Sequence, residues 1–191
     1  MLYTRKLDIS RLKTSAFLFG PRMTGKTTLL KAHPEIHRID LLDYELESSY
    51  RVNPRLFWES LLSLPPGSKV AVDEIQKVPE LLNYVQRAIE DLRHKFILSG
   101  SSARKLKRKG VNLLGGRAID LKLHPLTQTE IGDDFQISVA LKYGTLPQIY
   151  ALNVERQVEQ AKLLLRSYYT TYIKEEIQAE AITRDIGAFQ R

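Results

Sequence analysis

The sequence of 191 residues predicts an α/β fold in which helices cover both faces of a five-stranded, mainly parallel sheet, followed by a small all-helical part. Two observations predict this class. Short apolar runs alternate with stretches of helical periodicity up to residue 124. The helical stretches are about ten residues or longer, as crossovers between parallel strands require. After Pro125 only helical patterns occur, so we expect a core at residues 1–124 and a helical subdomain at residues 125–191.

The sequence predicts five strands, in the last of which Ile119, Leu121 and Leu123 alternate with polar neighbours. The strands are expected at residues 16–19, 36–42, 69–72, 96–98 and 118–123. The first run stops at Gly20, and helical patterns follow from Lys26, from Pro54 and beyond Pro79. In the second part, helical patches at residues 127–131 and 135–143 precede a long helical stretch that begins at Val154.

Composition limits the classes of function. The chain has no Cys, which excludes disulfides, thiolate metal sites and a Cys nucleophile. Its apolar runs are far shorter than the roughly 20 residues that cross a bilayer, and no signal-peptide core follows the N-terminus. We therefore expect a cytoplasmic protein without membrane segments. The net charge of +7 fits a polyanionic partner, although nucleotide phosphates alone account for part of such a bias.

Much of the positive charge lies in one basic run. Its cations are Arg104, Lys105, Lys107, Arg108 and Lys109. Two interpretations stay open: a solvated loop or helix end, or a contact with nucleic acid or phosphate.

The string GPRMTGKT at residues 20–27 matches the pattern G-x-x-x-x-G-K-[ST] between an expected strand and an expected helix. Its backbone N–H groups can surround phosphate oxygens, and the helix N-terminus adds positive potential. Lys26 is expected to reach the β and γ phosphates, and the Thr27 hydroxyl to bind Mg²⁺. The candidate cofactors are ATP and Mg²⁺, and the candidate nucleotide-binding residues are Gly20, Pro21, Arg22, Met23, Thr24, Gly25, Lys26, Thr27 and Thr28.

Two carboxylates follow the third expected strand, at the end where ligands collect in a parallel sheet. Asp73 is expected to hold Mg²⁺, directly or through water. Glu74 is then placed to orient and polarise an attacking water. A residue that positions water favours a hydrolase, because a P-loop kinase must shield the phosphoryl group from water.

Further candidates follow the fourth strand and precede the fifth. Ser99 and Ser101 are candidates to touch the γ phosphate or the attacking water, or are ordinary turn and helix-cap serines. Arg104 and Arg117 are candidates to neutralise charge that builds on the γ phosphate, from their own chain or from a neighbouring one.

With these residues the chain resembles the bacterial and archaeal AAA+-type ATPases whose ATPase core is joined to a C-terminal domain of unknown function. The likeness is carried by FLFGPRMTGKTTLLK at 17–31, VDEIQKVPELL at 72–82, FILSGSSARKL at 96–106 and NLLGGRA at 112–118. It implies a P-loop NTPase three-layer sandwich and marks Ser101 as similar to the sensor serine. Met23 departs from the polar residue that is usual in the family at that position. Family members also continue beyond the segment that ends here at Arg191, so we expect this chain to be the N-terminal ATPase part.

Three functions follow as hypotheses. The first is an ATPase that acts as a switch or energy source for a partner, with a homo-oligomer as a further expectation. The second is a nucleic-acid-binding module that uses the basic run and a helix at residues 167–176. The third, a P-loop kinase, is disfavoured by Glu74 and by the lack of an arginine-rich lid.

Overall fold

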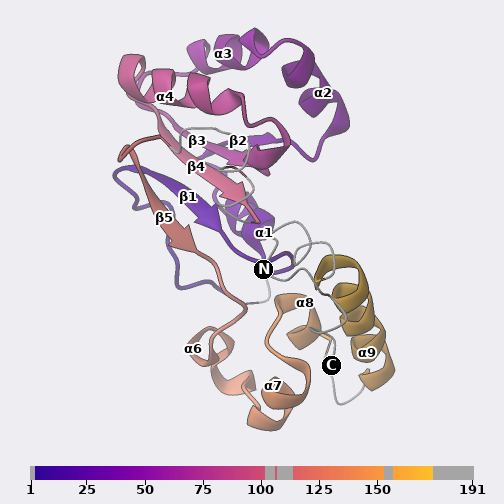
Figure 1. The fold of residues 1–191 in the computed structure, drawn as a ribbon. Coiled ribbons are helices and arrows are strands. Elements are labelled where there is room, and N and C mark those ends of the chain that lie inside the picture. The colour runs from indigo at the N-terminus through magenta and orange to yellow at the C-terminus, as the bar shows by residue number, and fades with distance from the viewer. Residues whose placement is uncertain (1–2, 102–105, 107–113, 153–156, 174–191) are drawn as a thin grey trace. The chain divides into compact units, whose positions relative to one another are not determined.

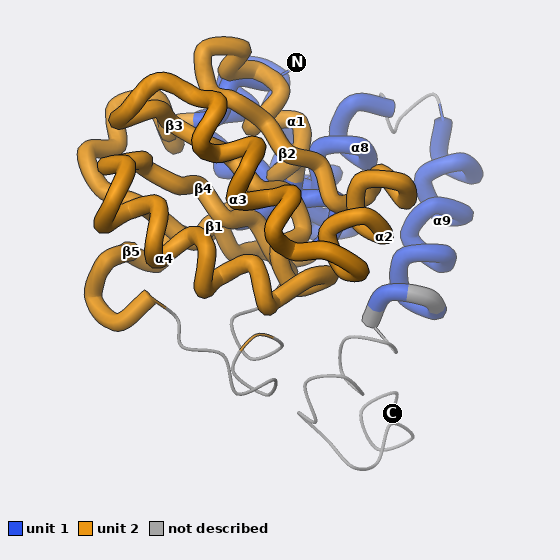
Figure 2. The backbone as a smooth tube through the Cα atoms, turned by 90° about the horizontal axis from the view of Figure 1, so that it is seen from above, with its two compact units in different colours: residues 1–5, 22–24, 124–191 blue, residues 6–21, 25–123 orange. Residues whose placement is uncertain are grey.

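The computed structural model describes residues 3–101, 106, 114–152 and 157–173. The chain divides into two compact units, which Figure 2 colours separately. Unit 1 comprises Met1–Arg5, Arg22–Thr24 and His124–Arg191, and unit 2 comprises Lys6–Pro21 and Gly25–Leu123. Among the described residues, no helix has the length and apolar character needed to cross a membrane.

Unit 2 is built on a sheet of five strands (Figure 1). They are β1 (Ser15–Phe19), β2 (His37–Asp40), β3 (Lys69–Asp73), β4 (Lys95–Gly100) and β5 (Ala118–Lys122). The order is β2-β3-β4-β1-β5, and all four pairings are parallel. The predicted α/β class is therefore confirmed. Because the strands are parallel, their carboxyl ends meet at one edge, where Phe19 pairs with Gly100 and Asp40 with Asp73.

Helices bury both faces of this sheet. One face packs against α2 (Tyr44–Val52), α3 (Arg55–Leu62) and α4 (Leu81–Asp91). The other face packs against α1 (Lys26–Lys31) and the segment around Ile9. Neighbouring residues of β1 divide between the faces, as strand alternation requires: Phe17 and Phe19 join the first core, and Leu18 joins the second.

Helix α2 is an element that the sequence patterns did not indicate. Its apolar side is narrow, because Tyr50 is buried while Tyr44 and Val52 are largely exposed. Local polar bonds define it instead. The Asp43 carboxylate caps the helix by accepting hydrogen bonds from the backbone N–H groups of Glu45 and Leu46, at 2.9 and 3.2 Å. Such a cap contributes about 1 kcal/mol to helix stability.

Unit 1 consists of short helices. They are α6 (Gln128–Ile131), α7 (Ile137–Tyr143), α8 (Pro147–Tyr150) and α9 (Val158–Ser167), with a π-helical stretch at Tyr168–Ile173. One small core gathers around Leu146, Ile149 and Ala161. Another gathers around Leu126, Ile131 and Tyr150. That residues 125–191 form a separate domain stays a prediction.

Candidate functional site

The loop between β1 and α1 carries the GPRMTGKT sequence. Two of its residues have positive φ angles: Met23 at 63° and Gly25 at 91°. A positive φ is unusual for a residue other than glycine, and it occurs mainly in turns and functional loops. Lys26, the first residue of α1, has its side chain buried. Its Nζ donates hydrogen bonds to the carbonyl oxygens of Gly20 at 2.7 Å and Pro21 at 3.0 Å, so the ammonium lies on the loop itself.

The other loop residues differ in exposure. Thr27 is half-buried and Thr28 is exposed, whereas Thr24 is fully buried. Met23 packs against the small core of unit 1 around Leu146 and Ile149. Its side chain therefore has a packing partner, which the sequence did not reveal. Arg22 lies over the ring of Tyr172, with 5.8 Å between its guanidinium carbon and the ring centroid.

The two carboxylates lie at the carboxyl edge of the sheet. Asp73 ends β3 and is completely buried. The hydroxyl of Ser99, which is also completely buried on β4, donates a short hydrogen bond to Asp73 Oδ1. The same hydroxyl accepts a hydrogen bond of 3.1 Å from the Glu74 backbone N–H. Ser99 thereby fixes the strand end and the residue after it relative to β4.

The second oxygen of Asp73 bears on metal binding. Within the described part of the chain, Asp73 Oδ2 is buried and accepts no hydrogen bond. A buried anionic oxygen left without a partner costs about 1–3 kcal/mol or more. A bound cation satisfies such an oxygen, and carboxylate and hydroxyl oxygens are the ligands that Mg²⁺ prefers. Asp73 thus fits the role of a magnesium ligand.

Glu74 has an unusual backbone conformation. Its φ of 59° and ψ of 46° place a non-glycine residue in the left-handed region. Such conformations cost of order 1 kcal/mol or more and persist where the surroundings enforce them. Its Oε2 accepts a short hydrogen bond from the Gln76 amide. Gln76 in turn lies close to Gly100, where an added Cβ atom would come within 2.7 Å of Gln76 Oε1.

The structure does not bring every predicted residue to this edge. Arg117 directly precedes β5, so it lies at the opposite, amino-terminal edge of the sheet, and its guanidinium pairs with Glu90 at 2.7 Å. A role for Arg117 at a neighbouring chain stays a prediction. Ser101 follows β4 at the carboxyl edge, and its Oγ has no hydrogen-bond partner among the described residues.

Some candidates lie outside the described residues. Arg104 and the rest of the basic run, Lys105, Lys107, Arg108 and Lys109, are among them. Their roles, including nucleic-acid binding, stay predictions.

Two residues make contacts in this geometry that the sequence did not indicate. Gln76 touches Glu74, and a search for polar residues two positions after the second carboxylate would have found it. Arg5 donates a hydrogen bond of 2.8 Å to the carbonyl oxygen of Thr24. Thr24 lies in the loop of residues 20–27, which we call the phosphate loop after its expected role. Arg5 lies 19 residues before Thr24 in the sequence, so no local pattern indicates this contact.

Comparison with known proteins agrees with this geometry. A family model described as an AAA domain matches residues 13–132. No curated protein matches the chain. The matched segment covers more than half of the chain and contains the phosphate loop, Asp73, Glu74 and Ser99. The fold, the loop and the family model together support a nucleotide-binding, ATPase-like function in general. The chain belongs to the AAA domain family of P-loop ATPases.

Proposed function

We propose that this chain binds ATP together with Mg²⁺ at the loop of residues 20–28 and hydrolyses it. The observation that carries the proposal is the buried Asp73 carboxylate. One of its oxygens is held by Ser99, and the other accepts no hydrogen bond within the described residues. An arrangement of this kind suits a carboxylate that ligates a metal more than one that serves packing, because packing alone leaves the second oxygen unsatisfied.

Thr27 and Asp73 are the residues that would hold Mg²⁺. When bound, Mg²⁺ neutralises negative charge on the phosphate oxygens. The Lys26 ammonium carries three N–H donors on a flexible stem and already lies on the loop. It is therefore suited to neutralise the β and γ phosphates.

Glu74 is the candidate for the residue that activates water. Its backbone is fixed by the hydrogen bond to Ser99, and its side chain is held by Gln76. A carboxylate oriented in this way can accept a proton from water as the water attacks the γ phosphorus. General-base assistance of this kind contributes about 10²–10⁴ in rate.

The chain would use ATP binding and hydrolysis as a molecular switch or as an energy source for a partner. Binding and hydrolysis of a nucleotide change the charge at the carboxyl edge of the sheet, and loops at such an edge respond to the γ phosphate in other switch proteins.

The decisive experiment is Glu74→Gln, measured as ATP turnover and as ADP affinity. We expect turnover to fall by about a hundredfold or more while ADP binds as before, because the amide cannot accept the proton. Glu59→Gln, at an exposed glutamate of α3 that pairs with Arg55 on the surface, is the matched control. Turnover by Glu74→Gln at the parent's rate would contradict the proposed role.

A further inference from the structure

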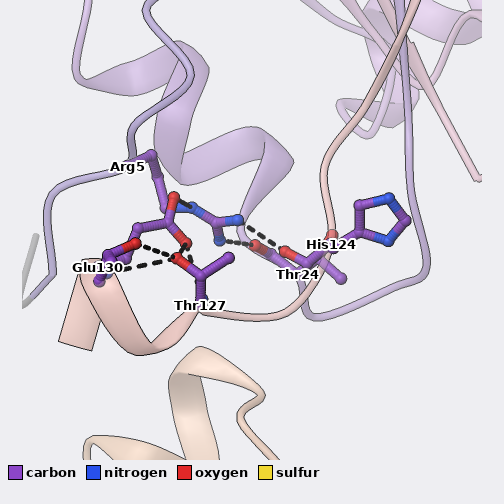
Figure 3. A network of polar contacts seen from close by, with 6 residues as sticks. Arg5, Thr24, His124, Thr127 and Glu130 are labelled. Carbon is purple, nitrogen blue, oxygen red and sulfur yellow. Dashed lines mark hydrogen bonds and ion pairs between the residues drawn. The ribbon is translucent and has the colours of Figure 1, made fainter. Parts of the chain in front are cut away.

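Arg5 lies at the centre of a buried polar network in unit 1 (Figure 3). Its guanidinium donates three hydrogen bonds: to Glu130 Oε1 at 3.0 Å, to the Thr24 carbonyl at 2.8 Å and to the His124 carbonyl at 2.6 Å. The side chains of Arg5 and Glu130 are only 5% and 4% exposed. Three segments that are far apart in the sequence therefore meet at one cation.

The position of this guanidinium is fixed from the other side by Glu130. Glu130 belongs to the capping box of α6: its Oε2 accepts from the Thr127 backbone N–H at 2.9 Å, and its own N–H donates to Thr127 Oγ1 at 3.3 Å. A carboxylate held by a helix cap has little freedom to move. Because the guanidinium is planar and rigid, fixing one of its N–H groups also fixes the directions of the others.

The bond to Thr24 has a consequence for the phosphate loop. The Thr24 carbonyl and the Gly25 N–H belong to the same peptide unit, and in a trans peptide these two groups point in opposite directions. When Arg5 holds the carbonyl, the Gly25 N–H must point away from Arg5. Gly25 is the second glycine of the phosphate-loop pattern, whose N–H groups are expected to bind phosphate.

Local sterics do not hold this peptide in one orientation. Gly25 has a φ of 91°, and a glycine occupies positive and negative φ values with similar ease. The peptide between Thr24 and Gly25 can therefore rotate unless another group restrains it. The hydrogen bond from Arg5 supplies that restraint.

We propose that Arg5 is a positioning residue for phosphate binding: by holding the Thr24 carbonyl, it presents the Gly25 N–H to the nucleotide's phosphates. This inference rests on the proposed function, since it assumes that the loop binds a nucleotide. Arg5 itself does not touch the phosphates. Its contribution is to remove a peptide rotation that would otherwise oppose binding.

The alternative is that Arg5 only stabilises unit 1. The variant Glu130→Gln distinguishes this stabilising role from the proposed role in positioning the phosphate loop. The glutamine keeps an acceptor for the Arg5 N–H but removes the negative charge and the acceptor for the Thr127 N–H, so thermal stability should fall. The bond from Arg5 to Thr24 is left in place. Arg5→Ala removes both the stabilisation and the bond to Thr24.

The test measures ADP affinity in the presence of MgCl₂, the melting temperature, and the Gly25 amide resonance in ¹⁵N-labelled full chain. We expect Arg5→Ala to weaken ADP binding about tenfold, as loss of one hydrogen bond to a charged group does, and to abolish the shift of the Gly25 resonance on ADP addition. Glu130→Gln should lower the melting temperature, yet bind ADP within about threefold of the parent and retain the Gly25 shift.

Arg5→Lys keeps the test decisive if Arg5→Ala does not fold. The lysine ammonium can pair with Glu130 but cannot reproduce the planar fork, so we expect a folded protein whose ADP binding is still weakened. Parent-like ADP affinity and a parent-like Gly25 shift in the arginine variants would overturn the inference, as would equal losses of affinity in Arg5→Ala and Glu130→Gln. If the parent chain itself binds no ADP, the proposed function fails, and this inference fails with it.

Discussion

Ser99→Ala tests how the two carboxylates are held in place. The substitution removes a hydroxyl that is completely buried and that bonds both Asp73 and the Glu74 N–H. It leaves Asp73 with neither carboxylate oxygen bonded within the described residues. The substitution removes a single oxygen atom and keeps Cβ, so the main loss is polar.

The size of the effect follows from the two bonds. A hydrogen bond to a charged group contributes about 1.5–3 kcal/mol, and a neutral one about 0.5–1.5 kcal/mol. Their loss together should lower the free energy of unfolding by about 2–4 kcal/mol. For a domain of this size, that corresponds to a fall in melting temperature of about 5–15 °C.

Thermal unfolding in the presence of EDTA measures this cost without a metal contribution. Ser63→Ala, at an exposed serine of the same chain, is the matched control and should change the free energy of unfolding by less than about 0.5 kcal/mol. A double-mutant cycle with Asp73→Asn then isolates the charge, because Ser99→Ala should cost at least about 1 kcal/mol less when residue 73 is neutral. A melting temperature of Ser99→Ala within about 2 °C of the parent, or equal costs in both backgrounds, would refute the reasoning.

Three further predictions concern unit 2. Gly100→Ala places a Cβ at 2.7 Å from Gln76 Oε1, so the flexible glutamine side chain must shift. We expect ATP turnover to fall several-fold while the free energy of unfolding changes by less than about 1 kcal/mol. Unchanged turnover would contradict this expectation. Burial of Asp40 opposes its ionisation, but the Arg38 guanidinium at 2.5 Å and other donors outweigh it and hold the Asp40 pKa below 3.8. Because the folded-state pKa is lowered, this pair stabilises the fold fully above pH 3.8, and the stabilisation is lost as the pH falls through the lowered pKa. In Arg38→Gln the NMR titration midpoint of Asp40 should therefore rise. An unchanged midpoint would argue against the pairing. Phe57→Ala empties a fully buried position of α3 and should cost about 3–5 kcal/mol in chemical denaturation, whereas a cost below about 1 kcal/mol would show that the core collapses around it.

The sequence predicted the sheet well because unit 2 is patterned simply. Strands β1, β3 and β4 contain short apolar runs that the sequence makes plain, whereas β2 and β5 carry more polar residues. The loop from Gly20 to Thr27 and the pair Asp73-Glu74 also follow strands directly, so one rule about parallel sheets places them at the same edge. The positions of motifs that directly follow a strand could therefore be predicted from the sequence.

The parts that sequence reasoning missed depend on contacts between distant segments. Helix α2 is defined by the Asp43 cap, and its narrow apolar side gives no strong periodicity. Arg117 belongs to the family motif NLLGGRA, yet the register of β5 puts it at the amino-terminal edge of the sheet. Arg5 meets Glu130 across more than a hundred residues, and a single arginine near an N-terminus carries no signal of that pairing.

Met23 occupies one of the positions between the two glycines of the phosphate loop, and its side chain packs against a core inside the protein. The pattern G-x-x-x-x-G-K-[ST] leaves this position undefined. Here its side chain packs with Leu146 and Ile149, so its size and polarity are constrained by a core rather than by a nucleotide. We expect homologues with a polar residue at this position to carry compensating substitutions at the two partners. The residue at position 23 would then covary with those at positions 146 and 149.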